Sequence, residues 1–334
     1  MRSRHRGAAR WALLLGLRGC CLLVAGLAAA GSALADDLRI AVSRGPVSLL
    51  IYVAEAQGYF GREGVAVQLQ ECTSGRNCFQ LMSQGKADLA TAAELLVSLE
   101  SFTGSDAAII ATLNSSSHSI QLVGRRSAGI KAEPDMRGKK VATVAGTSAQ
   151  YFLDRWLVFH GIDPKDVKVL PLAADQLTGA LLRHEADAVA IWEPIASATV
   201  AALAQDAWVL PSPRVYVQHF SLIASRQAIS RREADLIKLL RALARAARFV
   251  AERPAQSLQI LNTRLGSEHG LSVLSENDFR LVLEQPLIAT MEGQARWAAQ
   301  QGLAQHRGSP PSLMRSIEPS LLRKAVPGAV SLVQ

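Results

Sequence analysis

A short pattern that occurs twice in the chain limits its possible folds more than any other feature. In each copy a predicted helix is followed by a turn with an Ala-Asp pair, a short apolar strand and an acidic residue. The first copy contains Ala87-Asp88 and Glu94, and the second contains Ala186-Asp187 and Glu193. Both the Ala-Asp pairs and the acidic residues are offset by 99 positions. Two similar α/β halves explain this offset economically, and chance similarity between Ala-rich segments is the alternative.

Strand and helix patterns alternate through both halves, which is typical of parallel sheets covered by helices. Short apolar runs predict strands at Leu38–Val42, Val65–Leu69, Leu89–Thr91, Ala108–Leu113, Lys140–Val144, Val167–Pro171 and Ala188–Ile191. Between them the helical period predicts helices over Ser48–Gln57, Phe79–Gln84, Ala149–His160 and Leu177–Arg183. The predicted fold class is therefore α/β.

The C-terminal third has a mostly helical pattern. Ser230 and Glu233 have the spacing of a capping box, which predicts the start of a helix. That helix has a leucine-rich face and an opposite face with three arginines, which we interpret as solvated. Further helical patterns occur at Glu276–Leu283 and Met291–Gln300.

If this third packs back on the first half, the chain crosses between the halves twice. We predict these crossings near His118–Val123 and Tyr216–Leu222, where apolar and polar residues alternate. The predicted domains are a lobe I formed by residues 36–121 with 220–334, and a lobe II formed by residues 122–219.

The N-terminus predicts export. Four arginines within the first ten residues are followed by a mostly apolar run and then by Ser32-Ala33-Leu34-Ala35. This is the three-part pattern of a secretory signal that is cleaved after Ala35, so residues 1–35 are predicted to be a signal peptide. One alternative is a membrane anchor, which the short run interrupted by Arg18 disfavours. Another is a lipoprotein attached at Cys20. The predicted location is the periplasm.

The charge balance changes when the signal is removed. The chain has 36 Lys and Arg against 28 Asp and Glu, but five of the arginines and none of the acids lie in residues 1–35. The exported part is therefore close to neutral, and its charge does not indicate nucleic-acid binding. Its length favours two lobes over one core. No later stretch reaches transmembrane length free of charge, so we expect the exported part to be soluble.

Small polar residues follow the predicted strands. In an open α/β sheet a ligand binds where parallel strands end and the next helices begin. Free N–H groups and a partial positive charge at those helix starts favour anions. The candidate ligand-binding residues taken from these loops are Ser43, Gly45, Pro46, Ser74, Gly75, Glu94, Thr147, Ser148, Trp192 and Glu193.

Each candidate also has a purely structural interpretation. Thr147 and Ser148 could only cap their helix, and Glu94 and Glu193 could cap a helix or pair locally. Trp192 is predicted to form a wall of the cleft, because a Trp at a strand end is rarely wholly buried.

Residue patterns for other functions are missing. Arg44 and Arg76 lie in the same loops and are interpreted as solvated charges. The histidines do not have metal-ligand spacing, so no metal site is predicted. The chain has no G-x-S-x-G, Walker A, H-E-x-x-H, C-x-x-C or G-x-G-x-x-G motif, and we therefore predict neither an enzyme nor a cofactor.

Cys72 and Cys78 are the cysteines that follow the predicted signal peptide. In an oxidising exported compartment they could form a local disulfide. The alternative is two free thiols whose Cα atoms stay beyond bonding range.

Several of these segments also resemble a known family. They are Leu38–Val42, Tyr52–Phe60 and Gly85–Leu89 in the first half, Arg137–Val141, Gly146–Ser148 and Ala186–Pro194 in the second, and the tail over 311–334. Together they resemble the nitrate/sulfonate/taurine-type periplasmic substrate-binding proteins of ABC transporters, which share their fold with thiamine-pyrimidine synthase-like proteins. The resemblance implies a type II periplasmic binding protein fold, with two α/β lobes joined by a two-crossing hinge.

The resemblance also implies a function. The chain would be the solute-binding subunit of an ABC importer, would capture a small sulfonate, amino-sulfonate or related anionic or zwitterionic solute between its lobes, and would deliver it to a permease in the inner membrane. Thr147-Ser148 and Ser74-Gly75 would hold the acidic group. Glu94 or Glu193 could receive an amine, which favours a zwitterion such as taurine over nitrate. We expect a monomer.

Two other functions stay open at this point. A periplasmic ligand-sensing adaptor for a signalling receptor would have the same domains. A thiamine-pyrimidine synthase-like enzyme is disfavoured, because the run of Cys with His near the active site of that branch is missing here, and Cys72 with Cys78 does not replace it.

Overall fold

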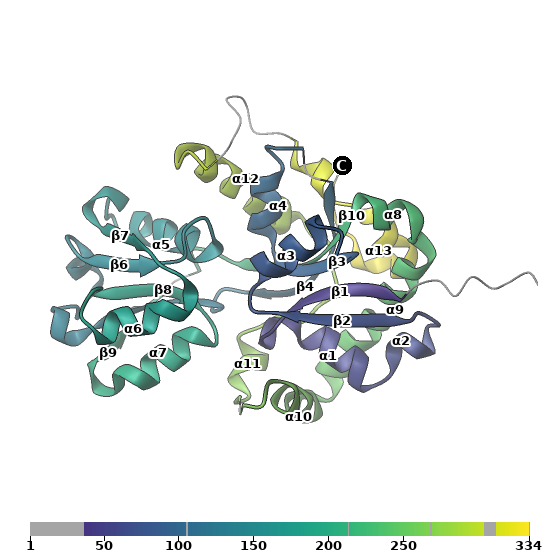
Figure 1. Ribbon diagram of the computed structural model, residues 1–334, viewed down its shortest axis with the longest axis horizontal. Coiled ribbons are helices and arrows are strands. Elements are labelled where there is room, and N and C mark those ends of the chain that lie inside the picture. Colours follow the sequence, from purple (N-terminus) through teal and green to yellow (C-terminus); the bar gives the residue numbers. More distant parts are fainter. Residues whose placement is uncertain (1–36, 105, 213, 268, 304–311, 334) are drawn as a thin grey trace, which may run out of the picture. The chain divides into compact units, whose positions relative to one another are not determined.

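The computed structural model describes residues 37–104, 106–212, 214–267, 269–303 and 312–333 (Figure 1). The predicted signal peptide lies outside these residues. The described residues from Asp37 onward form one compact unit. Within the described part no helix is both long and apolar enough to cross a bilayer.

The first sheet has five strands in the order β2-β1-β3-β10-β4 among the described residues. They are β1 (Leu38–Ser43), β2 (Val67–Cys72), β3 (Leu89–Ala93), β4 (Ala107–Ser116) and β10 (Gln218–Ser225). β1 runs parallel to β2 and β3, whereas β10 is antiparallel to β3 and β4.

The second sheet repeats this plan with the order β7-β6-β8-β5-β9. Its strands are β5 (Ile120–Arg125), β6 (Lys140–Thr143), β7 (Lys168–Pro171), β8 (Ala188–Trp192) and β9 (Ala207–Val209). β6 is parallel to β7 and β8, and β5 is antiparallel to β8 and β9. Each sheet thus contains three neighbouring parallel strands. The next strand in the order, β10 or β5, is antiparallel to them and begins where the chain has just crossed from the other sheet.

The repeated Ala-Asp pair has a physical explanation. The Asp88 carboxylate accepts a hydrogen bond from the backbone N–H of Arg39 at 2.9 Å, at the start of β1. The Asp187 carboxylate accepts one from the backbone N–H of Lys140, also at 2.9 Å, at the start of β6. Each aspartate therefore fixes the register of two neighbouring parallel strands. The interpretation of the repeat as two similar α/β halves is confirmed.

Helices cover both sheets. Those of the first half are α1 (Leu49–Ala56), α2 (Tyr59–Arg62), α3 (Gly75–Ser83) and α4 (Glu94–Glu100). Those of the second are α5 (Ser148–Phe159), α6 (Leu177–Leu182) and α7 (Ile195–Leu203). The C-terminal third adds α8 (Arg226–Arg231), α9 (Glu233–Glu252), α10 (Pro254–Leu265), α11 (Ser272–Ser275), α12 (Gln285–Gln300) and α13 (Pro319–Ala325).

This third packs on the helices of the first sheet. α9 and α10 lie against α1, and α12 lies against α4 (Figure 1). The predicted capping box is wrong, because Ser230 belongs to α8 and its hydroxyl donates to the Gln227 carbonyl. Arg232 is the N-cap of α9, and no side-chain hydrogen bond caps the helix there.

The predicted helix over Glu276–Leu283 is also wrong. Here the chain is extended and pairs with the outer edge of β4, where Asp278 lies opposite Ser115 and Val282 opposite Thr112. Phe279, Leu281 and Leu283 are buried, and this alternation is the period of a strand. Free backbone groups at the edge of β4 are satisfied by this segment, which outweighs its helical propensity.

Two short connections carry the chain between the sheets. Residues 117–119 link β4 to β5, and the chain returns between Val209 and Gln218. The predicted domain limits stay a prediction. Because only three residues separate Ser116 from Ile120, the ends of the two sheets lie within about 14 Å of each other.

Candidate ligand-binding site

The carboxyl ends of the parallel strands of both sheets face the crossings. In the first sheet Gln218, the first residue of β10, pairs with Ser116, and Phe220 pairs with Ala93 at the end of β3. In the second sheet Ile120 pairs with Trp192 at the end of β8. The loops that the sequence predicts to bind a ligand therefore lie on the side of each sheet that faces the crossings.

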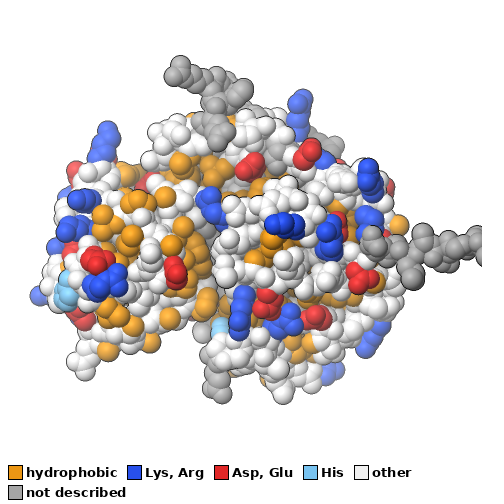
Figure 2. All heavy atoms as spheres, viewed as in Figure 1, with side chains coloured by type: hydrophobic (Ala, Val, Ile, Leu, Met, Phe, Trp, Pro, Cys, Tyr) orange, Lys and Arg blue, Asp and Glu red, His pale blue; other side chains and the backbone are white. Residues whose placement is uncertain are grey.

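A direct contact joins two of these loops. The Arg76 guanidinium, in the first turn of α3, donates to the Gly146 carbonyl, just before α5, at 2.5 Å. The starts of α3 and α5 consequently lie opposite each other. Arg76 was interpreted as a solvated charge, and the structure gives it this partner in the other half. On the face shown in Figure 2, Lys and Arg are interspersed with Asp and Glu.

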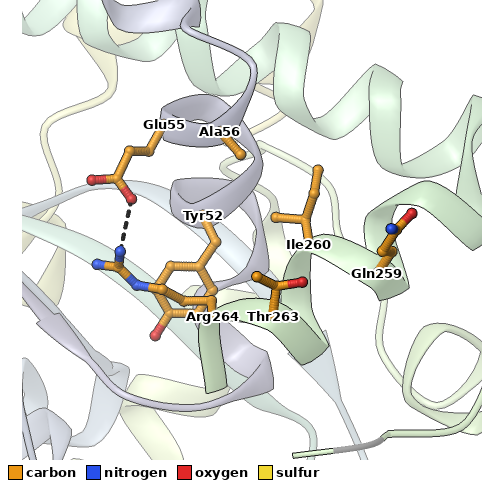
Figure 3. Close-up of a pocket in the computed structure, with 7 residues that line it drawn as sticks. All are labelled: Tyr52, Glu55, Ala56, Gln259, Ile260, Thr263 and Arg264. Carbon is orange, nitrogen blue, oxygen red and sulfur yellow. Dashed lines mark ion pairs between the residues drawn. The ribbon is translucent and has the colours of Figure 1, made fainter. Parts of the chain in front are cut away.

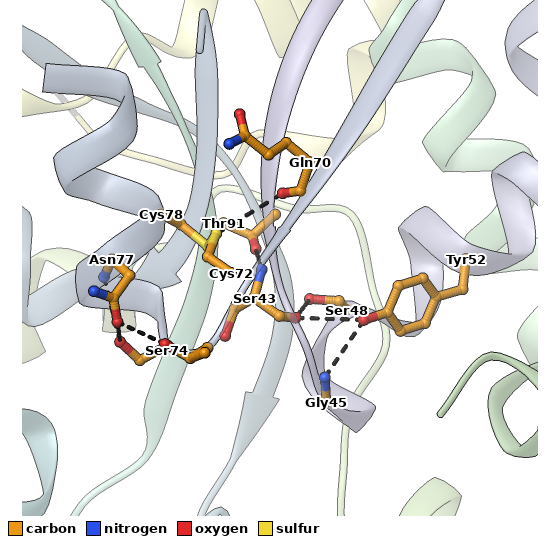
Figure 4. The surroundings of a disulfide bond; sticks show 11 residues. Ser43, Gly45, Ser48, Tyr52, Gln70, Cys72, Ser74, Asn77, Cys78 and Thr91 are labelled. Carbon is orange, nitrogen blue, oxygen red and sulfur yellow. Dashed lines mark hydrogen bonds between the residues drawn. A yellow bond between two sulfur atoms is a disulfide. The ribbon is translucent and has the colours of Figure 1, made fainter. Parts of the chain in front are cut away.

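The loop after β1 is held by hydroxyl groups from the loop itself, from α1 and from β3 (Figure 4). The Ser43 N–H donates to the Thr91 hydroxyl at 2.8 Å, and the Ser43 carbonyl accepts from the Ser48 hydroxyl at 2.7 Å. The Tyr52 hydroxyl lies 3.4 Å from both the Ser43 oxygen and the Gly45 nitrogen. Pro46 begins a short 3-10 helix, as its fixed φ favours. These hydrogen bonds therefore fix the conformation of the loop that contains Ser43, Gly45 and Pro46.

The loop after β2 is fixed by a disulfide between Cys72 and Cys78, whose Cα atoms are 5.6 Å apart (Figure 4). The local disulfide is confirmed. Ser74 is the N-cap of α3, and its hydroxyl accepts from the Asn77 N–H. Gly75 permits close packing, because a Cβ there would lie 3.0 Å from the Cα of Ala92.

The start of α5 combines capping with a contact to the crossing. The Thr147 hydroxyl accepts from the Ala149 N–H and donates to the Val144 carbonyl, so Thr147 caps the helix. The Ser148 hydroxyl accepts a hydrogen bond from the Gln218 side-chain amide at 2.9 Å. Ser148 is 7% exposed. Its hydrogen has no acceptor among the described residues, and it remains available for a ligand.

Glu94 lies deeper than expected. Its side chain is 0% exposed, and its carboxylate accepts from the Tyr216 hydroxyl at 2.6 Å, the Gln294 amide at 2.6 Å and the His219 N–H at 2.9 Å. Burial raises the pKa of Glu94 to about 7, although these hydrogen bonds oppose the rise. A direct contact between this carboxylate and a solute, predicted from the sequence, does not fit this placement.

Trp192 and Glu193 end β8. Trp192 is partly buried and packs against a hydrophobic cluster that spans both halves and against a second cluster within the second half. One oxygen of Glu193 accepts from the Gln121 amide at 2.6 Å, and the other accepts from the Ser197 N–H at 3.0 Å. Glu193 therefore caps α7, as its structural interpretation predicted, and both of its oxygens have protein donors.

Sequence reasoning missed three buried residues beside the crossings. Tyr216, Gln218 and Gln294 come from the returning crossing, the start of β10 and α12. Gln294 lies 200 positions from Glu94, and Tyr216 lies 122 positions from it. The alternation of polar and apolar residues at Tyr216–Leu222 marked the crossing, but no local pattern indicated these partners.

The helices α5 and α12 form a second contact surface, next to Tyr216. Asp154 on α5 accepts from the Trp297 indole at 2.7 Å and from the Gln301 amide at 3.2 Å, both on or next to α12. Tyr151 lies edge-on to Tyr216 and to Trp297, with ring centroids 5.1 and 5.3 Å away. Burial raises the pKa of Asp154, and the Trp297 hydrogen bond opposes the rise.

A separate cavity of about 330 Å³ opens between α1 and α10 (Figure 3). Arg264 lies over the Tyr52 ring and pairs with Glu55 and Glu71. Its charge is therefore already neutralised by two carboxylates.

A family model described as NMT1/THI5 like matches residues 46–257. A Bacillus subtilis (strain 168) protein named for binding aliphatic sulfonates is 26% identical over 165 residues, which are 48% of this chain and 49% of that protein. The match thus spans about half of that relative's length.

Solved structures share the fold. The alkanesulfonate-binding protein SsuA from Xanthomonas axonopodis pv. citri, bound to MOPS, has a TM-score of 0.71 at 18% identity, over 85% of this chain and 98% of that one. The nitrate-binding protein NrtA from Synechocystis has a TM-score of 0.70 at 14% identity, over 87% and 88%. The desulfurization enzyme DSZB has a TM-score of 0.60 at 15% identity, over 87% and 99%. These identities establish the fold alone, which here occurs in binding proteins and in an enzyme.

Proposed function

Because the chain belongs to the NMT1/THI5-like family, we propose that it is the solute-binding component of an ABC importer and captures a small organic sulfonate or related oxyanion between its two halves. The observation that carries the proposal is the meeting of the starts of α3 and α5 through Arg76 and Gly146. At the start of α5 the Ser148 hydroxyl has a hydrogen that no described residue accepts. Backbone N–H groups at helix starts and hydroxyl donors suit an oxyanion.

The positions of Glu94 and Glu193 indicate whether the solute needs an amine. Glu94 is enclosed, and both oxygens of Glu193 accept hydrogen bonds from the protein. Neither is positioned as a free partner for an amine. The proposal therefore favours a sulfonate without a required amine, which modifies the expectation of a zwitterion such as taurine.

The rest of the transport role follows from the same proposal. After removal of residues 1–35 the protein works in the periplasm, binds its solute as a monomer without changing it chemically, and delivers it to a membrane permease. The binding proteins named above support this role, and mass spectrometry of the released solute distinguishes it from the enzymatic one that the fold also permits.

Calorimetry of residues 36–334 with ethanesulfonate, taurine and nitrate tests the proposal. We expect ethanesulfonate to bind, and we expect Ser148→Ala to weaken it about tenfold, since a hydrogen bond to a charged group is lost. Ser230→Ala, on an exposed part of α8, is the matched control and should bind like the wild type. If none of the three anions binds, the proposal is wrong. If Ser148→Ala binds equally well, Ser148 does not belong to the site.

A further inference from the structure

Arg76 is placed where a positive charge is electrostatically unfavourable. It is the second residue of α3, and its guanidinium donates to the Gly146 carbonyl just before the start of α5. Because a helix start carries a partial positive charge, a cation beside it is repelled, whereas an anion is stabilised. Arg76 therefore lies next to two helix starts of its own sign, one in each half.

The protein does not offset this charge with a carboxylate. Other arginines have such partners, for example Arg125 with Asp187. Within the described ranges Arg76 forms no ion pair, and the Gly146 carbonyl is the acceptor that it uses. The first turns of α3 and α5 contain no acidic residue. The charge of Arg76 is therefore free to attract an anion from solution.

Arg44, in the loop after β1, shows the usual arrangement for an arginine. Its guanidinium also donates to a backbone carbonyl, that of Leu265, at 2.8 Å. Leu265 is the last residue of α10, and the partial negative charge at a helix end stabilises a cation. Arg44 and Arg76 thus use the same kind of acceptor, but only Arg76 is bound where its charge is opposed by the surroundings.

The Arg76 guanidinium keeps N–H groups for a ligand. It has several donors, and the Gly146 carbonyl accepts from one of its nitrogens. Gly146 leaves room for this approach, because a Cβ there would lie 3.3 Å from that nitrogen. Two residues further along, the Ser148 hydroxyl has a hydrogen that the described residues do not accept. A charged donor and a neutral donor are thus present at the loop that begins α5.

We propose that Arg76 determines the specificity for a negatively charged solute, because its guanidinium binds the oxyanion directly and the oxyanion supplies the missing counter-charge. The proposal rests on the proposed function for the class of solute. A guanidinium is a planar fork that can donate parallel hydrogen bonds to the oxygens of a sulfonate. A neutral sulfonyl group of the same shape gains only the weaker uncharged bonds. An unfavourable placement that stabilises the bound anion is typical of a functional residue.

Calorimetry at pH 7 with ethanesulfonate and ethanesulfonamide tests the proposal, because the two have nearly the same shape and only the first is charged. We expect the wild type to prefer the sulfonate. Arg76→Gln should bind the sulfonate about thirtyfold more weakly and the sulfonamide almost as before. Arg44→Gln is the matched control and should keep the wild-type preference. If the wild type has no preference, or if Arg76→Gln retains it by weakening both solutes equally or neither, the proposal is overturned.

Thermal unfolding without solute separates this proposal from the proposed function. At low salt Arg76→Gln should unfold at a higher temperature than the wild type, because the repulsion from two helix starts is removed. Arg76 is exposed, so salt should screen the repulsion and reduce this difference. Arg44→Gln should gain no stability. A lower midpoint of Arg76→Gln at low salt overturns the proposal even if sulfonates bind. A higher midpoint that salt lowers toward the wild type supports an uncompensated charge even if ethanesulfonate does not bind.

Discussion

At the scale of single residues, Glu94 shows most clearly how burial changes the role of a side chain. The sequence places it at a strand end, where a ligand contact and a local pair were both reasonable. Its partners come from α12 and from the returning crossing, 200 and 122 positions away. Such long-range partners leave no local pattern, so the sequence could predict the position of Glu94 but not its enclosure.

Glu94 should make stability depend on pH. Its folded pKa of about 7 lies above the ordinary value of 4.5, so its contribution is fully present below pH 4.5 and is lost as pH rises through 7. The loss is on the order of 3 kcal/mol for a shift of this size. Urea unfolding at pH 5 and pH 8 measures it. We expect the wild type to lose more stability than Glu94→Gln between these values. An equal loss would mean that Asp154 or other groups are responsible.

Gly75 is predicted to be required for packing. A Cβ at this position meets the backbone Cα of Ala92 at 3.0 Å, so α3 would have to move away from β3. We expect Gly75→Ala to destabilise the protein by about 1–3 kcal/mol, the usual cost of overpacking. Gly61→Ala is the control, because Gly61 lies in α2 with nothing within 4 Å of an added Cβ. Thermal unfolding of both variants decides, and equal midpoints would contradict the packing argument.

At the scale of elements, local patterns predicted a strand or helix correctly where all the residues that determine it lie within that element. The strand starts at Leu38, Leu89, Lys140 and Ala188 agree with the structure. Short apolar runs are typical of strands in a parallel sheet that is buried on both faces. The helix predicted over Glu276–Leu283 is wrong. Its alternating residues Phe279, Leu281 and Leu283 belong to an extended segment that pairs with the edge of β4, a strand remote in the sequence.

The disulfide between β2 and α3 should stabilise the loop that holds Ser74 and Gly75. Closing so short a loop contributes about 2 kcal/mol in the chain-entropy model. We expect Cys72→Ala with Cys78→Ala to melt at a lower temperature than the oxidised wild type. Reductant should lower the wild-type midpoint and leave the double variant unchanged. A wild type that is indifferent to reductant would contradict a stabilising role.

At the scale of the whole molecule, the two sheets are joined by short crossings and by side chains that no local pattern predicts. The repeat was sufficient to predict two α/β halves, and the predicted crossings overlap the connections between the sheets at residues 118–119 and 216–217. The contacts that hold the halves together involve Asp154, Trp297, Gln301 and Tyr151, which the sequence analysis did not select. They were missed because each is an ordinary helix residue until α5 and α12 are brought side by side.

The contact between α5 and α12 should help to keep the halves closed. Trp297→Phe removes the indole N–H that Asp154 accepts at 2.7 Å and leaves the buried carboxylate with the longer bond from Gln301. A poorly satisfied buried acceptor costs about 1–3 kcal/mol, and separating the two helices exposes it to water. The closed fraction of the unliganded protein should therefore fall, and small-angle scattering should show a larger radius of gyration. Trp208→Phe is the matched control, since the Trp208 indole N–H has no acceptor among the described residues. If both variants scatter like the wild type, this contact does not govern opening.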